Sequence, residues 1–157
     1  MARVKLDIPE KLPFHTELEV RIGDVNYGRH LGNDAVLSLL HEARLRFLKH
    51  HGFSEEEAGG AGMIMLDAVI VYAAQAFHGD VLRAEVGAGD FGACGCDFYY
   101  RLVRVRDGRE IARAKTSLAF FDYEAERIVR MPATKLPKIW RQMRERPLRT
   151  TPRKTHP

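Results

Sequence analysis

Cysteine is scarce in this chain of 157 residues, which has only Cys94 and Cys96. Two cysteines placed two positions apart in an expected strand cannot bond comfortably to each other, so we expect no disulfide framework. They also lack the second ligand pair of a structural zinc site, and we expect no metal. Reduced thiols are typical of the cytoplasm, where we expect this protein to reside.

Long apolar runs are also missing, because no stretch approaches the roughly 20 apolar residues that a transmembrane helix needs. The N-terminal residues MARVKLDIPEKLPF are charged and lack the apolar core of a secretory signal. The whole chain is 45% hydrophobic and 29% charged, which is the composition of a soluble globular protein. The length predicts one domain, which we place at residues 1–143.

Acidic residues are nearly absent from the last stretch, RQMRERPLRTTPRKTHP, where Glu145 stands alone among six basic residues. This composition predicts a solvated, flexible tail over residues 144–157. Contact with nucleic acid or an anionic surface is the alternative. Apart from Trp140, however, no aromatic side chain is interleaved for base stacking, so nucleic acid is not an expected partner.

The most informative stretch is residues 21–44, RIGDVNYGRHLGNDAVLSLLHEAR. Residues 15–22 alternate polar and apolar side chains as a strand does, and the glycine-rich residues 23–32 predict a loop. A helix begins at Asn33 or Asp34, both favoured N-cap types, and continues at helical apolar spacing to a stop at Gly52. A loop that brings polar side chains to a helix N-terminus can hold a developing negative charge.

The remaining sequence predicts a short helix from Ser54 and then an antiparallel sheet. Gly87 and Gly89 indicate a bulge or bend, and Asp107-Gly108 is a pair favoured in tight hairpins. The expected elements are strands over residues 63–74, 81–86, 94–106, 110–121 and 127–131, and a terminal helix over 135–143. A long helix followed by such strands predicts an α+β fold with the sheet curled around the helix.

Residues 21–44 resemble the opening signature of hotdog-fold acyl-CoA thioesterases of the 4-hydroxybenzoyl-CoA thioesterase type, R-[FI]-G-D-x-D-x-x-G-H-[VL]-x-N, followed by a helix with E-A-R. The matching residues are Arg21, Gly23, Asp24, His30, Leu31, Asn33, Glu42, Ala43 and Arg44. A weaker match runs from Tyr72 to Gly79-Asp80. The resemblance implies a hotdog fold of five to six strands, a homodimer and possibly a homotetramer. It also implies an acyl-CoA or aryl-CoA substrate, with coenzyme A as part of the substrate rather than a cofactor.

One departure from the family pattern falls on the catalytic position. Asn26 stands where the family has its catalytic carboxylate, and an amide neither attacks a thioester usefully nor takes a proton near neutral pH. Some other hotdog thioesterases pair an Asn or Gln of this loop with a carboxylate of the central helix. Glu42 is the helical acid available for that role, or else it is a structural acid. Asp34 either caps the helix or faces the site.

The other candidate residues also have two interpretations each. His30 is a general base or hydrogen-bonds within the loop, and Asn33 is an N-cap or a substrate-facing amide. Asp24 organises the loop near the substrate, with Tyr27 beside it. On an outward strand face, Arg113 and Lys115 either contact the phosphates of coenzyme A or belong to a solvated surface.

Three functions remain as hypotheses. The first is an acyl-CoA thioesterase whose helix N-terminus polarises the thioester carbonyl. The second is a non-catalytic hotdog module that binds an acyl thioester or a protein partner, because the usual acid is missing. The third is an interaction protein that acts through its basic tail.

Overall fold

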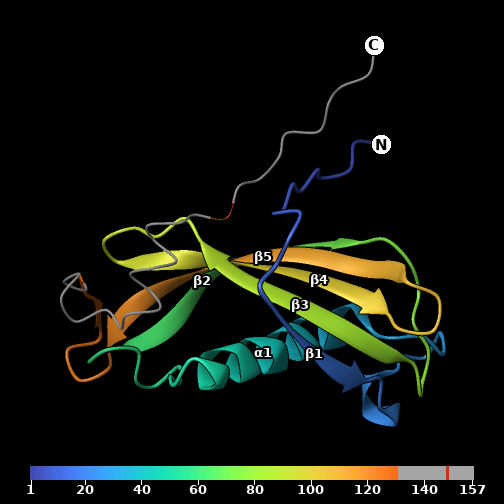
Figure 1. Ribbon diagram of the computed structural model, residues 1–157, viewed down its shortest axis with the longest axis horizontal. Helices are drawn as coiled ribbons and strands as arrows, with labels where there is room; N and C mark the ends of the chain where they lie inside the picture. The colour runs from blue at the N-terminus through green and yellow to red at the C-terminus, as the bar shows by residue number, and fades with distance from the viewer. Residues whose placement is uncertain (131–147, 149–157) are drawn as a thin grey trace.

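The computed structural model describes residues 1–130 and 148, and it consists of one long helix packed against a curved sheet (Figure 1). A 3-10 turn, η1 (Ile22–Asp24), precedes the helix, α1 (Asn33–His50). The strands are β1 (Phe14–Glu19), β2 (Gly62–Tyr72), β3 (Val81–Gly89), β4 (Gly95–Arg104), β5 (Arg109–Asp122) and β6 (Arg127–Ile128). The predicted α+β arrangement, a long central helix wrapped by an antiparallel sheet of five to six strands, is confirmed.

The sheet has the strand order β1-β3-β4-β5-β2, and β6 pairs with the end of β5. All the pairs are antiparallel. The order leaves β1 and β2 at the two edges. At eleven residues, β2 is a long edge strand, and it ends beside the loop that leads into α1.

The core lies between α1 and the concave face of the sheet. The helix buries an apolar stripe made of Val36, Leu39, Leu40, Ala43, Phe47 and Leu48. On β5, the small residues Ala112 and Ala114 are fully buried and leave room for a helix to pack closely. Along β4 every second side chain points into the core, with Phe98, Tyr100 and Leu102 inside.

Two local predictions are wrong. Ser54 Oγ accepts a hydrogen bond from Glu57 N at 3.1 Å, but no helix follows, because the backbone is drawn towards β2 by the bond from Met63 N to Glu55 O at 2.7 Å. Of the bulge or bend expected at Gly87 and Gly89, the bulge is also absent, since β3 pairs with β4 in unbroken register. A Cβ at Gly87 would lie 3.0 Å from Pro13 Cδ, so this glycine permits close approach of the N-terminal segment.

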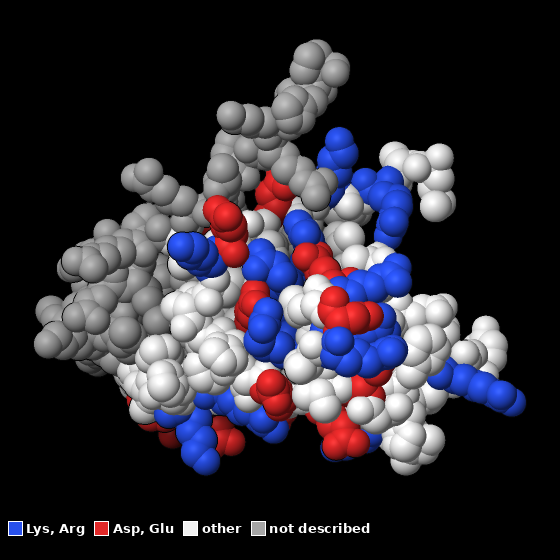
Figure 2. Space-filling model, turned by 45° about the vertical axis from the view of Figure 1, so that its right-hand side comes forward, with Lys and Arg blue, Asp and Glu red and all other residues white. Residues whose placement is uncertain are grey.

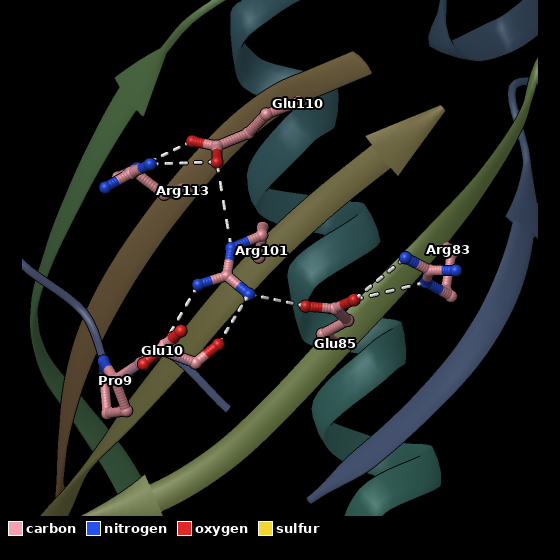
Figure 3. Close-up of polar contacts among 7 residues, drawn as sticks. All are labelled: Pro9, Glu10, Arg83, Glu85, Arg101, Glu110 and Arg113. Atoms are coloured by element: carbon pink, nitrogen blue, oxygen red, sulfur yellow. Dashed lines mark hydrogen bonds and ion pairs between the residues drawn. The ribbon is translucent and has the colours of Figure 1, made fainter. Parts of the chain in front are cut away.

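The outer face of the sheet, away from α1, carries a ladder of charged side chains across three strands (Figure 3). Glu85 on β3 accepts a hydrogen bond from Arg101 on β4 at 2.7 Å, and Glu110 on β5 lies 3.7 Å from the same guanidinium. Arg101 also donates to the carbonyls of Pro9 and Glu10, both at 3.2 Å. The ladder therefore holds the N-terminal segment against the sheet, and acidic and basic groups are interleaved on the surface (Figure 2).

The chain beyond Arg130 is mostly outside the described residues. The last predicted strand is found as β6, and the predicted terminal helix over 135–143 and the basic tail over 144–157 fall on residues that the structure does not describe, apart from position 148. Within the part that it does describe, no helix is long and apolar enough to cross a membrane.

We expect the ion pair in the hairpin between β4 and β5 to make the stability of the protein depend on acidic pH. The Arg104 guanidinium donates to the Asp107 carboxylate at 2.7 and 3.0 Å and lowers its pKa to about 2 from an ordinary 3.8. A carboxyl whose pKa is lowered in the folded protein stabilises the fold at pH values above its ordinary pKa. That stability is lost as the pH falls through about 2. We expect Asp107→Asn to reduce the fall in unfolding free energy between pH 4 and pH 2, measured by urea denaturation.

The matched control is Glu124→Gln, which changes an exposed carboxylate in the β5–β6 turn. It should keep the acid sensitivity of the unchanged protein. An equal fall in wild type and Asp107→Asn would contradict the assignment of this stability to the Arg104–Asp107 pair.

Candidate functional site

Asp24 anchors the start of the loop that leads into α1. It is 7% exposed, and its carboxylate accepts hydrogen bonds from Arg21 N at 2.8 Å and from the Arg21 guanidinium at 3.3 Å. Burial raises the pKa of the Asp24 carboxyl, but the Arg21 hydrogen bonds outweigh it, and the net pKa is lowered. Asp24 O accepts Gly32 N–H at 2.9 Å, so the residue holds both ends of the loop together.

Asn26 and His30 come together around Gly28. Asn26 Oδ1 accepts Gly28 N–H at 2.9 Å, and Asn26 N donates to His30 O at 3.0 Å. His30 Nδ1 lies 3.2 Å from Leu31 O, and since a carbonyl only accepts, Nδ1 carries the proton of this bond. A Cβ at Gly28 would lie 3.0 Å from His30 Nε2 and 3.2 Å from Asn26 Oδ1. The two predicted polar side chains therefore share one small cluster.

The N-terminus of α1 is capped differently from the prediction. Gly32, which has no side chain to accept a hydrogen bond, is the N-cap, and Asn33 is the first helical residue. The expectation that Asn33 or Asp34 is the N-cap is thus wrong. Gly32 N–H is used by Asp24 O, whereas helix geometry leaves the amides of residues 33–35 without intrahelical acceptors. These three N–H groups are the donors that the helix end can offer to an anion.

The Asp34 side chain folds back over this helix end. A Cβ at Gly32 would lie 2.5 Å from Asp34 Oδ1 and 3.7 Å from Asn26 Cβ. The carboxylate of Asp34 and the amide side chain of Asn26 therefore flank the same glycine, one from the helix and the other from the loop. This arrangement places an acid, an amide side chain and free backbone donors within one site.

The end of β2 and the segment that follows it support this site, and the last residue of β2, Tyr72, was not among the predicted site residues. Leu31 N donates to Ala76 O at 2.8 Å, and the Tyr72 hydroxyl donates to Asn33 O at 2.9 Å. Burial raises the pKa of Tyr72, and the nearby Asp34 carboxylate raises it further. The weak motif match that begins at Tyr72 was the available signal, but sequence alone does not show where the hydroxyl points.

A cavity of about 480 Å³ opens beside Asp34 and runs between α1 and β2. Its walls are mainly apolar, from Leu37, Met63, Ile64, Met65 and Leu118, with Ser38, Arg44 and Tyr123 also lining it. Its far end is polar. His41 lies there, about 10 Å along the helix from Asp34 at 1.5 Å per residue, with Glu55 beside it.

A charge network centred on the buried Arg44 lines that far end. The Arg44 side chain is 3% exposed and donates to Glu55 at 2.5 Å and to the Tyr100 hydroxyl at 3.2 Å. His41 Nε2 lies 2.9 Å from the other Glu55 oxygen, and the Tyr100 hydroxyl lies 3.0 Å from Thr116 Oγ1. The buried cation is therefore paired and hydrogen-bonded, as burial of a charge requires.

Several predicted residues lie away from this site within the chain. The Glu42 carboxylate pairs with Arg46 at 2.7 Å, and its position is about 13 Å along α1 from the first residue. Tyr27 is fully exposed. On the outer face of the sheet, Arg113 pairs with Glu110 at 2.6 Å, and Lys115 pairs with Asp97 at 3.0 Å. Among the residues described, no group of three or more His, Cys, Asp or Glu side chains could hold a metal ion.

Comparison with known proteins identifies the family. The chain belongs to the thioesterase-like superfamily, whose family model matches residues 20–139. This membership supports thioester hydrolysis as the general class of reaction, and it agrees with the resemblance seen in residues 21–44. No curated protein matches the chain.

Solved structures share the fold at low sequence identity. A 1,4-dihydroxy-2-naphthoyl-CoA thioesterase from Synechocystis is 20% identical with a TM-score of 0.69, over 76% of this chain and 89% of that one. A DHNA-CoA thioesterase from Staphylococcus aureus is 17% identical with a TM-score of 0.68, over 74% and 78%. A hypothetical protein from Thermus thermophilus is 22% identical with a TM-score of 0.69, over 78% and 92%. At these identities the likeness shows the hotdog fold.

Proposed function

We propose that this protein hydrolyses a thioester of coenzyme A at the N-terminus of α1. The observation that carries the proposal is the position of Asp34, whose carboxylate lies against Gly32 at the helix end and also lines the 480 Å³ cavity. Membership of the thioesterase-like superfamily supports the same reaction. Asp34 thus takes the role of the acid that is missing at Asn26.

The proposed reaction uses the groups of the site in order. The amide N–H groups of residues 33–35 donate to the carbonyl oxygen as negative charge develops on it, and each donor is typically worth roughly 3–4 kcal/mol in the transition state. Asp34 accepts a proton from a water molecule, whose oxygen adds to the carbonyl carbon. The C–S bond then breaks, the acid is released, and the thiolate of coenzyme A takes up a proton. Asn26 orients the water or the carbonyl.

The cavity is the proposed site of the acyl group. Its apolar walls favour an acyl chain or an aromatic ring. The similar fold of a 1,4-dihydroxy-2-naphthoyl-CoA thioesterase supports an aryl-CoA as one candidate. The length of the cavity along α1 suits an acyl group of limited size.

We also propose that the protein acts as a homodimer. In the described part of the chain β2 pairs on one side, with β5, and its eleven residues include the exposed Leu66 and Tyr72. A long apolar edge strand of this kind is a site for pairing with another chain. Pairing of two β2 strands would join two sheets edge to edge, as the hotdog resemblance implies.

Thiol release from a panel of acyl-CoA and aryl-CoA thioesters tests the proposal. We expect turnover above the uncatalysed rate for at least one member, measured with a thiol-reactive dye. The competing hypothesis is a hotdog module that binds without catalysis, since position 26 lacks an acid. Thermal stabilisation by acyl-CoA with no thiol release across the panel would favour that module and contradict the proposed hydrolysis.

A further inference from the structure

Tyr72, the last residue of β2, joins the edge of the sheet to the first residue of α1. Its hydroxyl donates to Asn33 O at 2.9 Å. In an α-helix the same carbonyl accepts the amide N–H of Leu37, four residues later. The hydroxyl therefore adds a second donor to one oxygen and ties the first turn of the helix to the sheet.

A second hydrogen bond from the same segment holds the other side of the helix entry. Leu31 N donates to Ala76 O at 2.8 Å. The two bonds thus act on the residues immediately before and after Gly32, where the free backbone donors begin. Ala76 acts through its backbone, whereas Tyr72 acts through a side-chain group that a single substitution removes.

The environment of Tyr72 keeps its hydroxyl a donor. Burial raises the pKa of Tyr72, and the Asp34 carboxylate raises it further, so the hydroxyl stays protonated throughout the neutral range. Its proton is directed at Asn33 O rather than at a substrate atom. The hydroxyl is therefore suited to holding the helix end in place and not to transferring protons.

We propose that Tyr72 is a positioning residue, which fixes the amides of residues 33–35 and the Asp34 carboxylate relative to Asn26. The inference rests on the proposed hydrolysis. It follows because Asn33 O belongs to the helix turn that carries the amides of residues 33–35 and the Asp34 carboxylate. A displacement of about 1 Å at a reacting centre can lower the rate by about 10²-fold.

The test is Tyr72→Phe, which removes the hydroxyl and keeps the ring. We expect kcat to fall by about 10- to 100-fold with KM nearly unchanged, because the acyl cavity does not include Tyr72. The matched control is Tyr99→Phe, which removes a buried hydroxyl that donates to Asp90 on the outer face of the sheet. We expect Tyr99→Phe to keep the kcat of the wild type even where it lowers the melting temperature.

A second readout separates this inference from the proposed function. Amide hydrogen exchange over residues 33–38 should be faster in Tyr72→Phe than in wild type or Tyr99→Phe, whether or not any thioester is hydrolysed. Unchanged exchange there would overturn the inference. So would a kcat equal to that of wild type, or equal losses of kcat in the two variants. Absence of hydrolysis by the wild-type protein would instead contradict the proposed function.

Discussion

Asp34→Asn is expected to lower kcat for the best CoA thioester by about 10³-fold, within the 10²–10⁴ range of general base catalysis. The amide keeps the shape of the side chain beside Gly32 but cannot accept a proton from water. The free amides of residues 33–35 remain, so residual activity above the uncatalysed rate is expected. Steady-state thiol release at pH 7, with KM determined separately, measures the effect.

Glu42→Gln is the comparison that distinguishes the two helical acids. Glu42 pairs with Arg46 on the exposed side of α1, and we expect its replacement to leave kcat nearly unchanged. If Glu42→Gln abolished hydrolysis and Asp34→Asn did not, the assignment of Asp34 as the general base would be wrong.

Phe47→Ala is expected to lower the free energy of unfolding by about 3–5 kcal/mol, the usual cost of removing a buried aromatic ring. Phe47 is fully buried, and its ring lies 5.7 Å from those of Phe14 and Phe98 and 4.6 Å from that of His51. It therefore joins β1, α1 and β4 in the centre of the core. Urea denaturation followed by circular dichroism measures the change.

Leu45→Ala on the same helix serves as the control. Leu45 is 37% exposed, and substitutions at surface positions usually change stability by no more than about 0.5 kcal/mol. Similar losses in the two variants would mean that the packing between α1 and the sheet does not dominate stability.

Most of the fold was predictable because the spacing of apolar residues and the residue types at the turns indicate the same elements along the chain. The helical spacing of Val36, Leu40 and Phe47 predicts the buried stripe of α1, and alternation along β4 predicts its inner face. The Asp107-Gly108 pair correctly marks the turn between β4 and β5. These signals are local, so one sequence is enough to find them.

The errors arise where distant segments decide the outcome. Gly87 suggests a bulge, but its neighbour is Pro13, which sequence reasoning does not place beside it. Arg44 was identified as part of the E-A-R match, and the structure buries it between Glu55 and Tyr100. A charged side chain among apolar ones carries no sign of a partner that lies 56 positions away.

The site was predictable in part. The loop chemistry of residues 23–32 indicates a polar cluster, and the structure does bring Asn26, His30 and Asp34 to one helix end. What the sequence does not show is how α1 and the sheet are placed relative to each other. The contact of Tyr72 with Asn33 depends on where β2 ends, and the choice between Asp34 and Glu42 depends on which face of α1 meets the cavity.

The glycine at the start of α1 has a cost for the helix itself. A Ser, Thr, Asp or Asn at the N-cap commonly contributes about 1 kcal/mol by accepting a first-turn amide, and Gly32 accepts none. The space that a capping side chain would fill is taken by the Asp34 carboxylate, and the first-turn amides stay open. The helix is thus locally less stable than it could be at the one end where an incoming carbonyl oxygen would serve as its cap.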